Sequence, residues 1–303
     1  MCLVAFAINA SERWPLVIAS NRDEFFDRPT LPLARWQSES GHTIISGRDE
    51  RAGGTWLGMT PGGRIALLTN VRERPALSQP PAPRSRGGLV MRWLENDMDA
   101  GQFMAHTDST AYAGFNLVVG DWSTDSWTWL SNRSFNSGPG GAAGNRPQRS
   151  GWHSRALAPG VYGLSNAALD TPWPKTLALK AALTDALAGA TSQEAGAMDT
   201  PLWTALASRH RADPGNLPDT GLPVAMEQAL SSAFVDSPER AYGTRCSTLL
   251  VASAAENQQD KHRWTVRVEE KTHLQPVKGK ATQEQSNVRA SQVFHWQRTS
   301  VVR

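Results

Sequence analysis

The sequence contains few of the residues that build disulfide or metal frameworks. Its 303 residues include two cysteines, Cys2 and Cys246, which are too few for the disulfide framework of a small secreted protein. The seven histidines show neither an HExxH motif nor paired spacing, so we expect no metal and no cofactor. Sparse cysteine is usual in a reducing compartment, and we therefore expect a cytoplasmic protein.

A large excess of one charge is also missing. Lysine plus arginine total 31 and aspartate plus glutamate total 28, which leaves a formal net charge of +3. So small an imbalance does not predict a nucleic-acid partner. No run reaches the ~20 apolar residues that cross a bilayer, and the first ten residues lack the basic segment of a signal peptide. We therefore expect a soluble protein without a membrane span, with Met1 and Cys2 at its mature N-terminus; the oligomeric state stays open.

The sequence does contain the material for a large core. Hydrophobic residues make up 40% of the chain and tryptophan occurs twelve times, as suits a globular protein. Strand-like segments come first, helical segments follow and strand-like segments return, without an internal repeat or a linker between two cores. We therefore expect residues 1–303 to form a single domain.

Short apolar runs rich in Val, Ile and Phe predict β-hairpins. The first hairpin joins residues 3–8 to residues 16–20, and pairing Asn9 with Pro15 places Cys2 opposite Arg22. Further strands are expected at residues 55–59 and 64–69, 114–120 and 126–130, 247–252, 264–268 and 292–296.

Helical spacing is clearest at residues 172–187, where an apolar stripe combines Trp173, Leu177, Leu179, Leu183, Ala186 and Leu187. Ser85 is expected to cap a helix over residues 86–94. Weaker helices fit residues 201–209 and 224–234. The proline-rich residues 75–83 and the glycine-rich residues 136–145 are expected to be loops.

The position of Cys2 has chemical consequences. Removal of Met1 would put a thiol and a free α-amine on one residue, and the amine could act as the base for the thiol. Ordinary pKa values of ~7.7 to 8.0 for the amine and ~8.5 for the thiol suit this role near neutral pH. Arg22 can lower the thiol pKa and Asp23 can orient the amine. From these residues alone, the interpretation of Cys2 as a small core residue beside a solvated hairpin end stays open and is favoured slightly.

Several short motifs follow one another in a specific order: Met1-Cys2, Asn21-Arg22-Asp23-Glu24, Gly53-Gly54-Thr55-Trp56-Leu57-Gly58, Leu67-Leu68-Thr69-Asn70, Ser85-Arg86-Gly87, Gly114-Phe115-Asn116-Leu117, Gly163-Leu164-Ser165-Asn166-Ala167 with Asp170 to Lys175, and Tyr242-Gly243-Thr244-Arg245. With these motifs the chain resembles the NRDE family, the transport-and-Golgi-organisation 2 relatives. This family is similar to the cysteine N-terminal nucleophile (Ntn) amidohydrolases, which include penicillin V acylases and bile-salt hydrolases. The resemblance implies an α+β fold, a four-layer αββα sandwich of the Ntn-hydrolase type.

The same resemblance implies catalytic roles for Cys2, Arg22, Asp23, Asn70, Asn166 and Arg245. Cys2 would be the nucleophile, Arg22 and Asp23 would assist it, and the two asparagines would support the oxyanion. The hydrolases separate their first Arg and Asp by two residues, whereas here the two are adjacent and point to opposite faces of an extended strand. Both would need a bend or bulge to reach Cys2.

Structural interpretations of these residues stay open. Arg245 could form an ion pair, and Asn70 and Asn166 could serve as turn and loop residues. Glu24 is expected to be a structural partner of Arg22 or Arg28, and Cys246 is expected to be buried packing.

The sequence is compatible with two functions. The first is hydrolysis of a carbon–nitrogen amide bond in a small acylated substrate. The alternative, which the family resemblance also implies, is a non-catalytic trafficking protein that binds haem, a lipid or acyl-CoA.

Overall fold

The first hairpin lies at the centre of the fold and is buried on both faces. The computed structural model describes residues 2–73, 84–135, 147–189, 198–254, 263–273 and 288–297. In it, β1 (Cys2–Ile8) and β2 (Leu16–Phe25) pair in one unbroken register from Cys2↔Arg22 to Ile8↔Leu16. The Asn9 N–H donates to the Pro15 carbonyl at 2.6 Å and closes the turn. The predicted register of this hairpin is confirmed.

The strands form two antiparallel sheets. The first sheet contains, in spatial order, β10 (Gly160–Leu164), β1, β2, β12 (Tyr242–Ala254), β13 (Arg263–Thr272) and β14 (Val288–Gln297), with the short β11 (Asp236–Ser237) paired to β12. The second sheet contains β3 (Thr30–Gln37), β4 (Thr43–Asp49), β5 (Leu57–Met59), β6 (Arg64–Asn70), β7 (Phe115–Asp121), β8 (Ser126–Phe135) and β9 (Pro147–Ala156).

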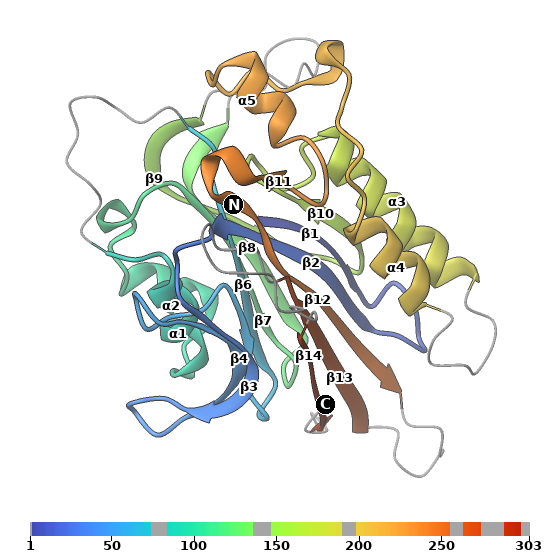
Figure 1. Cartoon of the computed structure of the whole chain (residues 1–303). Coiled ribbons are helices and arrows are strands. Elements are labelled where there is room, and N and C mark those ends of the chain that lie inside the picture. The colour runs from blue at the N-terminus through green and yellow to red at the C-terminus, as the bar shows by residue number, and fades with distance from the viewer. Residues whose placement is uncertain are drawn as a thin grey trace.

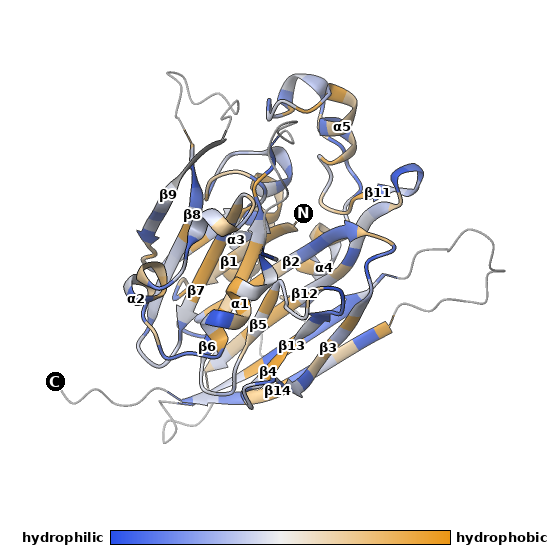
Figure 2. Cartoon of the chain, turned by 90° about the vertical axis from the view of Figure 1, so that its left-hand side faces the viewer, coloured by the Kyte–Doolittle hydropathy of each residue, from blue (hydrophilic) through white to orange (hydrophobic). Residues whose placement is uncertain are grey.

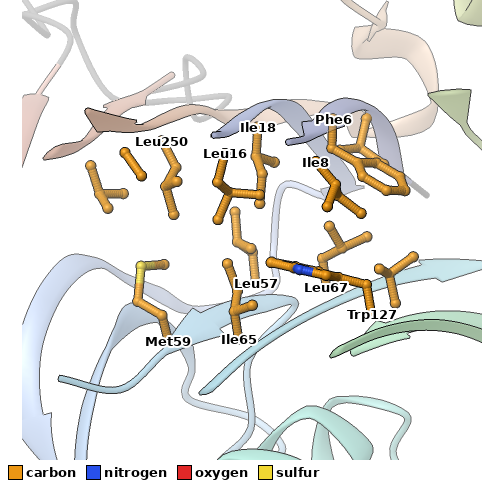
Figure 3. Packing of buried hydrophobic residues seen from close by; sticks show 14 of the residues in the cluster. Phe6, Ile8, Leu16, Ile18, Leu57, Met59, Ile65, Leu67, Trp127 and Leu250 are labelled. Carbon is orange, nitrogen blue, oxygen red and sulfur yellow. The ribbon is translucent and has the colours of Figure 1, made fainter. Parts of the chain in front are cut away.

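The sheets pack face to face through apolar side chains. Val4, Phe6 and Ile8 alternate along β1 toward the second sheet, because successive residues of a strand point to opposite faces. Figure 3 shows Phe6, Ile8, Leu16, Ile18 and Leu250 facing Leu57, Met59, Ile65, Leu67 and Trp127 across this layer. Burial of each such side chain contributes about 1.5–3 kcal/mol, so this layer is a main source of stability.

Helices cover the outer face of each sheet. Leu3, Ala5 and Ala7 on the other side of β1 pack against α3 (Pro174–Gly189) and α4 (Asp199–Leu206). The helices α1 (Gly87–Leu94) and α2 (Ala100–Ala105) pack on the outer face of the second sheet. The expected α+β, four-layer αββα sandwich is confirmed (Figure 1), and the hydrophobic residues concentrate in its central strands (Figure 2).

Some predicted elements differ from the structure. Ser85 does not cap α1, because the N-cap is Arg86 and no side chain accepts a capping hydrogen bond there. Leu177 was expected in the buried stripe of α3 but is 51% exposed, since Lys175 and Thr176 take the buried positions of the first turn. The sequence did not predict β3, β4, β9 or β10. The proposed loop at residues 75–83 lies outside the described residues, as does that at 136–145.

The remaining helix, α5 (Val224–Ala229), is shorter than the residues 224–234 expected for it. Along the part of the chain that the structure describes, no helix is both long and apolar enough to cross a membrane.

Two glycines let the start of α1 approach the segment before β5. A Cβ on Gly54 would lie 2.6 Å from the Gly87 carbonyl carbon and 2.8 Å from its oxygen. A Cβ on Gly87 would lie 3.2 Å from the Thr55 carbonyl oxygen. This contact between backbones fixes Arg86 and Thr55 beside each other.

We expect Gly54→Ala to lower the free energy of unfolding by about 1–3 kcal/mol, because the added methyl group overlaps the Gly87 backbone. Gly88→Ala is the matched control: a Cβ there meets nothing within 4 Å, and alanine in a helix should raise stability by about 0.5–1 kcal/mol. Urea unfolding measures both, and equal midpoints for Gly54→Ala and wild type would contradict the steric constraint.

Candidate active site

A small cavity of ≈ 80 Å³ opens where β1 begins and where β2 and β6 end, beside the start of α1. Its lining is mostly polar and charged and consists of Cys2, Arg22, Asp23, Glu24, Arg28, Asp49, Thr55, Trp56, Leu68, Asn70, Ser85, Arg86 and Gly87. The structure thus brings Cys2, Arg22, Asp23 and Asn70 to one cavity. Asn166 and Arg245 do not line it.

Cys2 and Arg22 share the face of the first sheet that points toward the second sheet. They are paired across β1 and β2, and paired residues of an antiparallel ladder project to the same side. The Arg22 guanidinium stacks over the Trp56 ring at 4.2 Å and donates to Thr30 Oγ1 at 3.2 Å. Burial raises the pKa of the Cys2 thiol and the charge of Arg22 lowers it, so Arg22 favours the thiolate.

Asp23 projects to the other face, toward the helices. On that face Asn21, two residues earlier, donates to the Leu206 and Ala233 carbonyls. Asp23 accepts a hydrogen bond from Thr244 Oγ1 at 2.7 Å. Burial raises the pKa of the Asp23 carboxyl, whereas the nearby Lys175 lowers it. The expectation that adjacent Arg22 and Asp23 point to opposite faces is confirmed.

No bulge in β2 is needed to bring Arg22 and Asp23 to the cavity. Both residues line it because it lies at the end of the sheet, where each face is accessible. The bulge in this region occurs in β12, between Thr244 and Cys246. Arg22 therefore lies on the face of the sheet that carries the Cys2 thiol, and Asp23 lies on the opposite face.

Lys175 ends the motif Asp170 to Lys175, but the sequence did not predict it at the site. It is 5% exposed, and its Nζ donates to the Leu230 carbonyl at 2.9 Å. Burial lowers the pKa of Lys175 to about 8, against the opposing effect of Asp23. Lys175 thus provides a buried positive charge near Asp23.

Asn70 ends β6 with a half-buried side chain that lines the cavity. No described residue forms a hydrogen bond with its side-chain amide. The amide N–H groups are therefore available to a ligand in the cavity.

Asn166 forms a hydrogen bond with Asn70 and does not line the cavity. It is fully buried, and its Nδ2 donates to the Asn70 carbonyl at 2.8 Å. The Ser165 hydroxyl lies 3.2 Å from both Asn166 Oδ1 and the Cys2 carbonyl. Asn166 therefore positions the end of β6 relative to the start of β1.

Arg245 lies near Arg22 but does not line the cavity. It occupies the bulge of β12, and its Nη1 donates to the carbonyls of Phe25, Phe26 and Arg28 at 2.8, 3.0 and 3.2 Å. In this position the guanidinium holds the turn after β2. Arg245 therefore stabilises that turn and does not contribute to the cavity lining.

Two structural expectations are confirmed. Glu24 Oε2 lies 3.9 Å from both Arg22 Nη2 and Arg28 Nε, and Cys246 is 3% exposed within the core between the sheets. Across the described ranges no three His, Cys, Asp or Glu residues gather as a metal-binding group.

The sequence did not identify Arg86 as a site residue. The motif Ser85-Arg86-Gly87 was the available signal, because Gly87 is the point where α1 meets Gly54 and all three residues line the cavity.

Comparisons with known proteins match most of the chain. The family model for Transport and Golgi organisation 2 matches residues 1–264. The Transport and Golgi organization protein 2 homolog of Bos taurus is 31% identical over 272 residues, which cover 84% of this chain and 89% of the relative. The Transport and Golgi organization 2 homolog of Mus musculus is 31% identical over 268 residues, with the same two coverages.

Two solved structures are similar in outline. A Caenorhabditis elegans N-acylethanolamine-hydrolyzing acid amidase ortholog is 11% identical, with a TM-score of 0.44, and covers 86% of this chain and 96% of its own. A conjugated bile acid hydrolase from Clostridium perfringens is 9% identical, with a TM-score of 0.37, and the coverages are 85% and 91%.

The titration of Lys175 should be visible in the pH dependence of stability. Its folded-state pKa of about 8 lies below the ordinary 10.5, so the unfolded chain holds more protons between these values and the free energy of unfolding should rise with pH there. We expect the difference between wild type and Lys175→Met to rise from pH 8 to 10.5, by at most about 1.4 kcal/mol per pH unit. Denaturant unfolding across this window tests it, and a flat difference would contradict the buried charge.

Proposed function

The chain belongs to the Transport and Golgi organisation 2 family, and we propose that this member is an N-terminal cysteine nucleophile hydrolase. The reaction is cleavage of a carbon–nitrogen amide bond in a small acylated substrate. One observation supports this most directly: Cys2, Arg22 and Asn70 line the same cavity, and the Asn70 side-chain amide forms no hydrogen bond with any residue that the structure describes.

The proposal requires removal of Met1, which gives Cys2 a free α-amine. Because burial raises the thiol pKa, the thiol needs a base, and an α-amine with an ordinary pKa of ~7.7 to 8.0 is suited to the task. Arg22 stabilises the thiolate on one face of the sheet. Asp23, on the other face, compensates the ammonium that forms when the amine takes the proton.

The first half of the reaction forms a thioester. The Cys2 sulfur bonds to the substrate carbonyl carbon, and the carbonyl electron pair moves to oxygen, where the Asn70 amide N–H stabilises the negative charge. The intermediate collapses, the carbon–nitrogen bond breaks, and the leaving nitrogen takes the proton from the α-ammonium.

The second half releases the acid. The free α-amine takes a proton from water, the resulting hydroxide attacks the thioester carbonyl, and Asn70 again stabilises the oxyanion. The carbon–sulfur bond then breaks, and the α-ammonium returns its proton to the sulfur, which regenerates the thiol and the free amine. Arg245, which clamps the turn after β2, is assigned a positioning role in keeping Arg22 and Asp23 at the cavity.

A non-catalytic carrier of haem, a lipid or acyl-CoA is the competing outcome. A carrier needs neither a free amine on Cys2 nor a transferable acyl group. The chemical state of residue 2 therefore separates the two functions.

We expect the purified wild-type protein to lack Met1 and to gain one acyl group on Cys2 when treated with p-nitrophenyl acetate, because the activated ester acylates a thiolate. Intact mass spectrometry with peptide mapping measures both. Cys2→Ala should gain no acyl group at the site, whereas Cys246→Ser should behave as wild type since Cys246 is buried in the core. Retained Met1, or equal labelling of Cys2→Ala, would favour the carrier.

With an amide substrate found by screening N-acyl compounds, Asn70→Ala should lower kcat about 10²–10³-fold, the range for loss of one oxyanion donor. Its melting temperature should stay close to wild type, since its side chain has no described partner. Asn166→Ala should lower both kcat and the melting temperature, because it removes the bond that holds the Asn70 carbonyl. Unchanged kcat in Asn70→Ala would remove Asn70 from the mechanism.

A further inference from the structure

The arginines of the cavity differ in how their charges are compensated. Arg28 is paired with Asp49, with its Nε and Nη2 at 2.8 and 2.7 Å from Oδ2. Arg22 lies 3.9 Å from Glu24. Both of these guanidinium groups therefore have a carboxylate of the protein as their counter-ion.

Arg86 has no such counter-ion among the residues that the structure describes. Its Nη1 donates to the Gly114 carbonyl at 3.0 Å, and no described carboxylate forms an ion pair with it. Glu73 lies in the same region, but both of its oxygens accept hydrogen bonds from Arg133 at 2.8 Å. Among the described residues, Arg86 is thus hydrogen-bonded to a neutral carbonyl and is not paired with a carboxylate.

The charge of Arg86 interacts electrostatically with Cys2, the nucleophile of the proposed reaction, and with Glu24. Burial lowers the pKa of Arg86, and Glu24 and Cys2 are the leading acidic groups that act against this effect. Its backbone is held by the contact between Gly87 and Gly54. The guanidinium is therefore both close to the nucleophile and fixed in place before a ligand binds.

An arginine fork is matched in shape to a carboxylate, which it can bind through two parallel hydrogen bonds. A half-buried cation without a counter-ion is costly unless a ligand supplies one. The cavity, at ≈ 80 Å³, has room for small groups only, which favours a carboxylate over a bulkier anion.

We propose that Arg86 forms an anion subsite, and that the substrates of this protein carry a carboxylate close to the bond that Cys2 attacks. This deepens the proposed function and rests on it for the role of Cys2. The binding subsite itself requires no catalysis, so the two can be tested separately.

The first test compares iodoacetate with iodoacetamide, which differ in charge but are similar in size. Each alkylates a thiolate by forming a carbon–sulfur bond as iodide leaves. The rate ratio of the two reagents at Cys2, followed by peptide mapping, cancels any change in the fraction of thiolate. We expect Arg86→Gln to lower the iodoacetate-to-iodoacetamide ratio about tenfold, as for loss of a charge-assisted hydrogen bond.

Two further variants control this measurement. Arg86→Lys keeps the charge without the fork and should give an intermediate ratio. Arg84 lies two residues before Arg86 and is exposed. Arg84→Gln removes a charge of the same sign and should leave the ratio at the wild-type value. An unchanged ratio in Arg86→Gln, or an equal fall in Arg84→Gln, overturns the subsite.

The second test needs no reactive thiol. Succinate should raise the melting temperature of wild type and not that of Arg86→Gln, while succinamide should raise neither. Stabilisation of both proteins by succinate, or of neither, overturns the subsite, and equal or stronger stabilisation by inorganic phosphate overturns the assignment to carboxylates. If neither alkylating reagent modifies Cys2 but succinate binds through Arg86, the proposed role of Cys2 as a nucleophile is contradicted and the anion subsite at Arg86 is supported.

Discussion

The pairing of Cys2 with Arg22 across β1 and β2 is the constraint on which the site depends. In an antiparallel ladder a slip of one residue would turn every side chain of β1 to the opposite face. Such a slip would move Val4, Phe6 and Ile8 out of the core between the sheets, so hydrophobic packing holds the thiol in register with the guanidinium. The stability of the core and the chemistry at its end are thus fixed by the same alternation.

That alternation also separates two electrostatic environments. On the face toward the second sheet, the thiol meets Arg22, which is stacked on Trp56. On the face toward the helices, Asp23 lies near the buried Lys175. In the proposed reaction the thiolate and the α-ammonium have opposite requirements for charge. Arg22 and Asp23, on opposite sides of one strand end, would meet both without a bulge in β2.

Buried polar contacts connect the outer elements to this strand end. Arg72, which follows β6, forms an ion pair with Glu227 of α5, and its N–H donates to the Asn166 carbonyl at 2.7 Å. Asn166 in turn holds the carbonyl of Asn70. Removal of one partner of such a buried pair leaves an uncompensated charge, so these contacts fix the end of β6 and with it the direction of the Asn70 amide.

The sequence by itself determined the hairpin register at Cys2 and Arg22, the order of the motifs and the opposite facing of Arg22 and Asp23, because each depends on local alternation and turn chemistry. Only the tertiary structure decided that Arg245 bonds to the turn after β2 and does not line the cavity, since the bulge in β12 interrupts alternation at that residue. It also decided that Lys175 approaches Asp23 and that Arg86 lacks a counter-ion, because both depend on contacts between segments far apart in the chain. Periodicity reports which face a residue occupies, whereas the partner that it meets there depends on how distant elements pack.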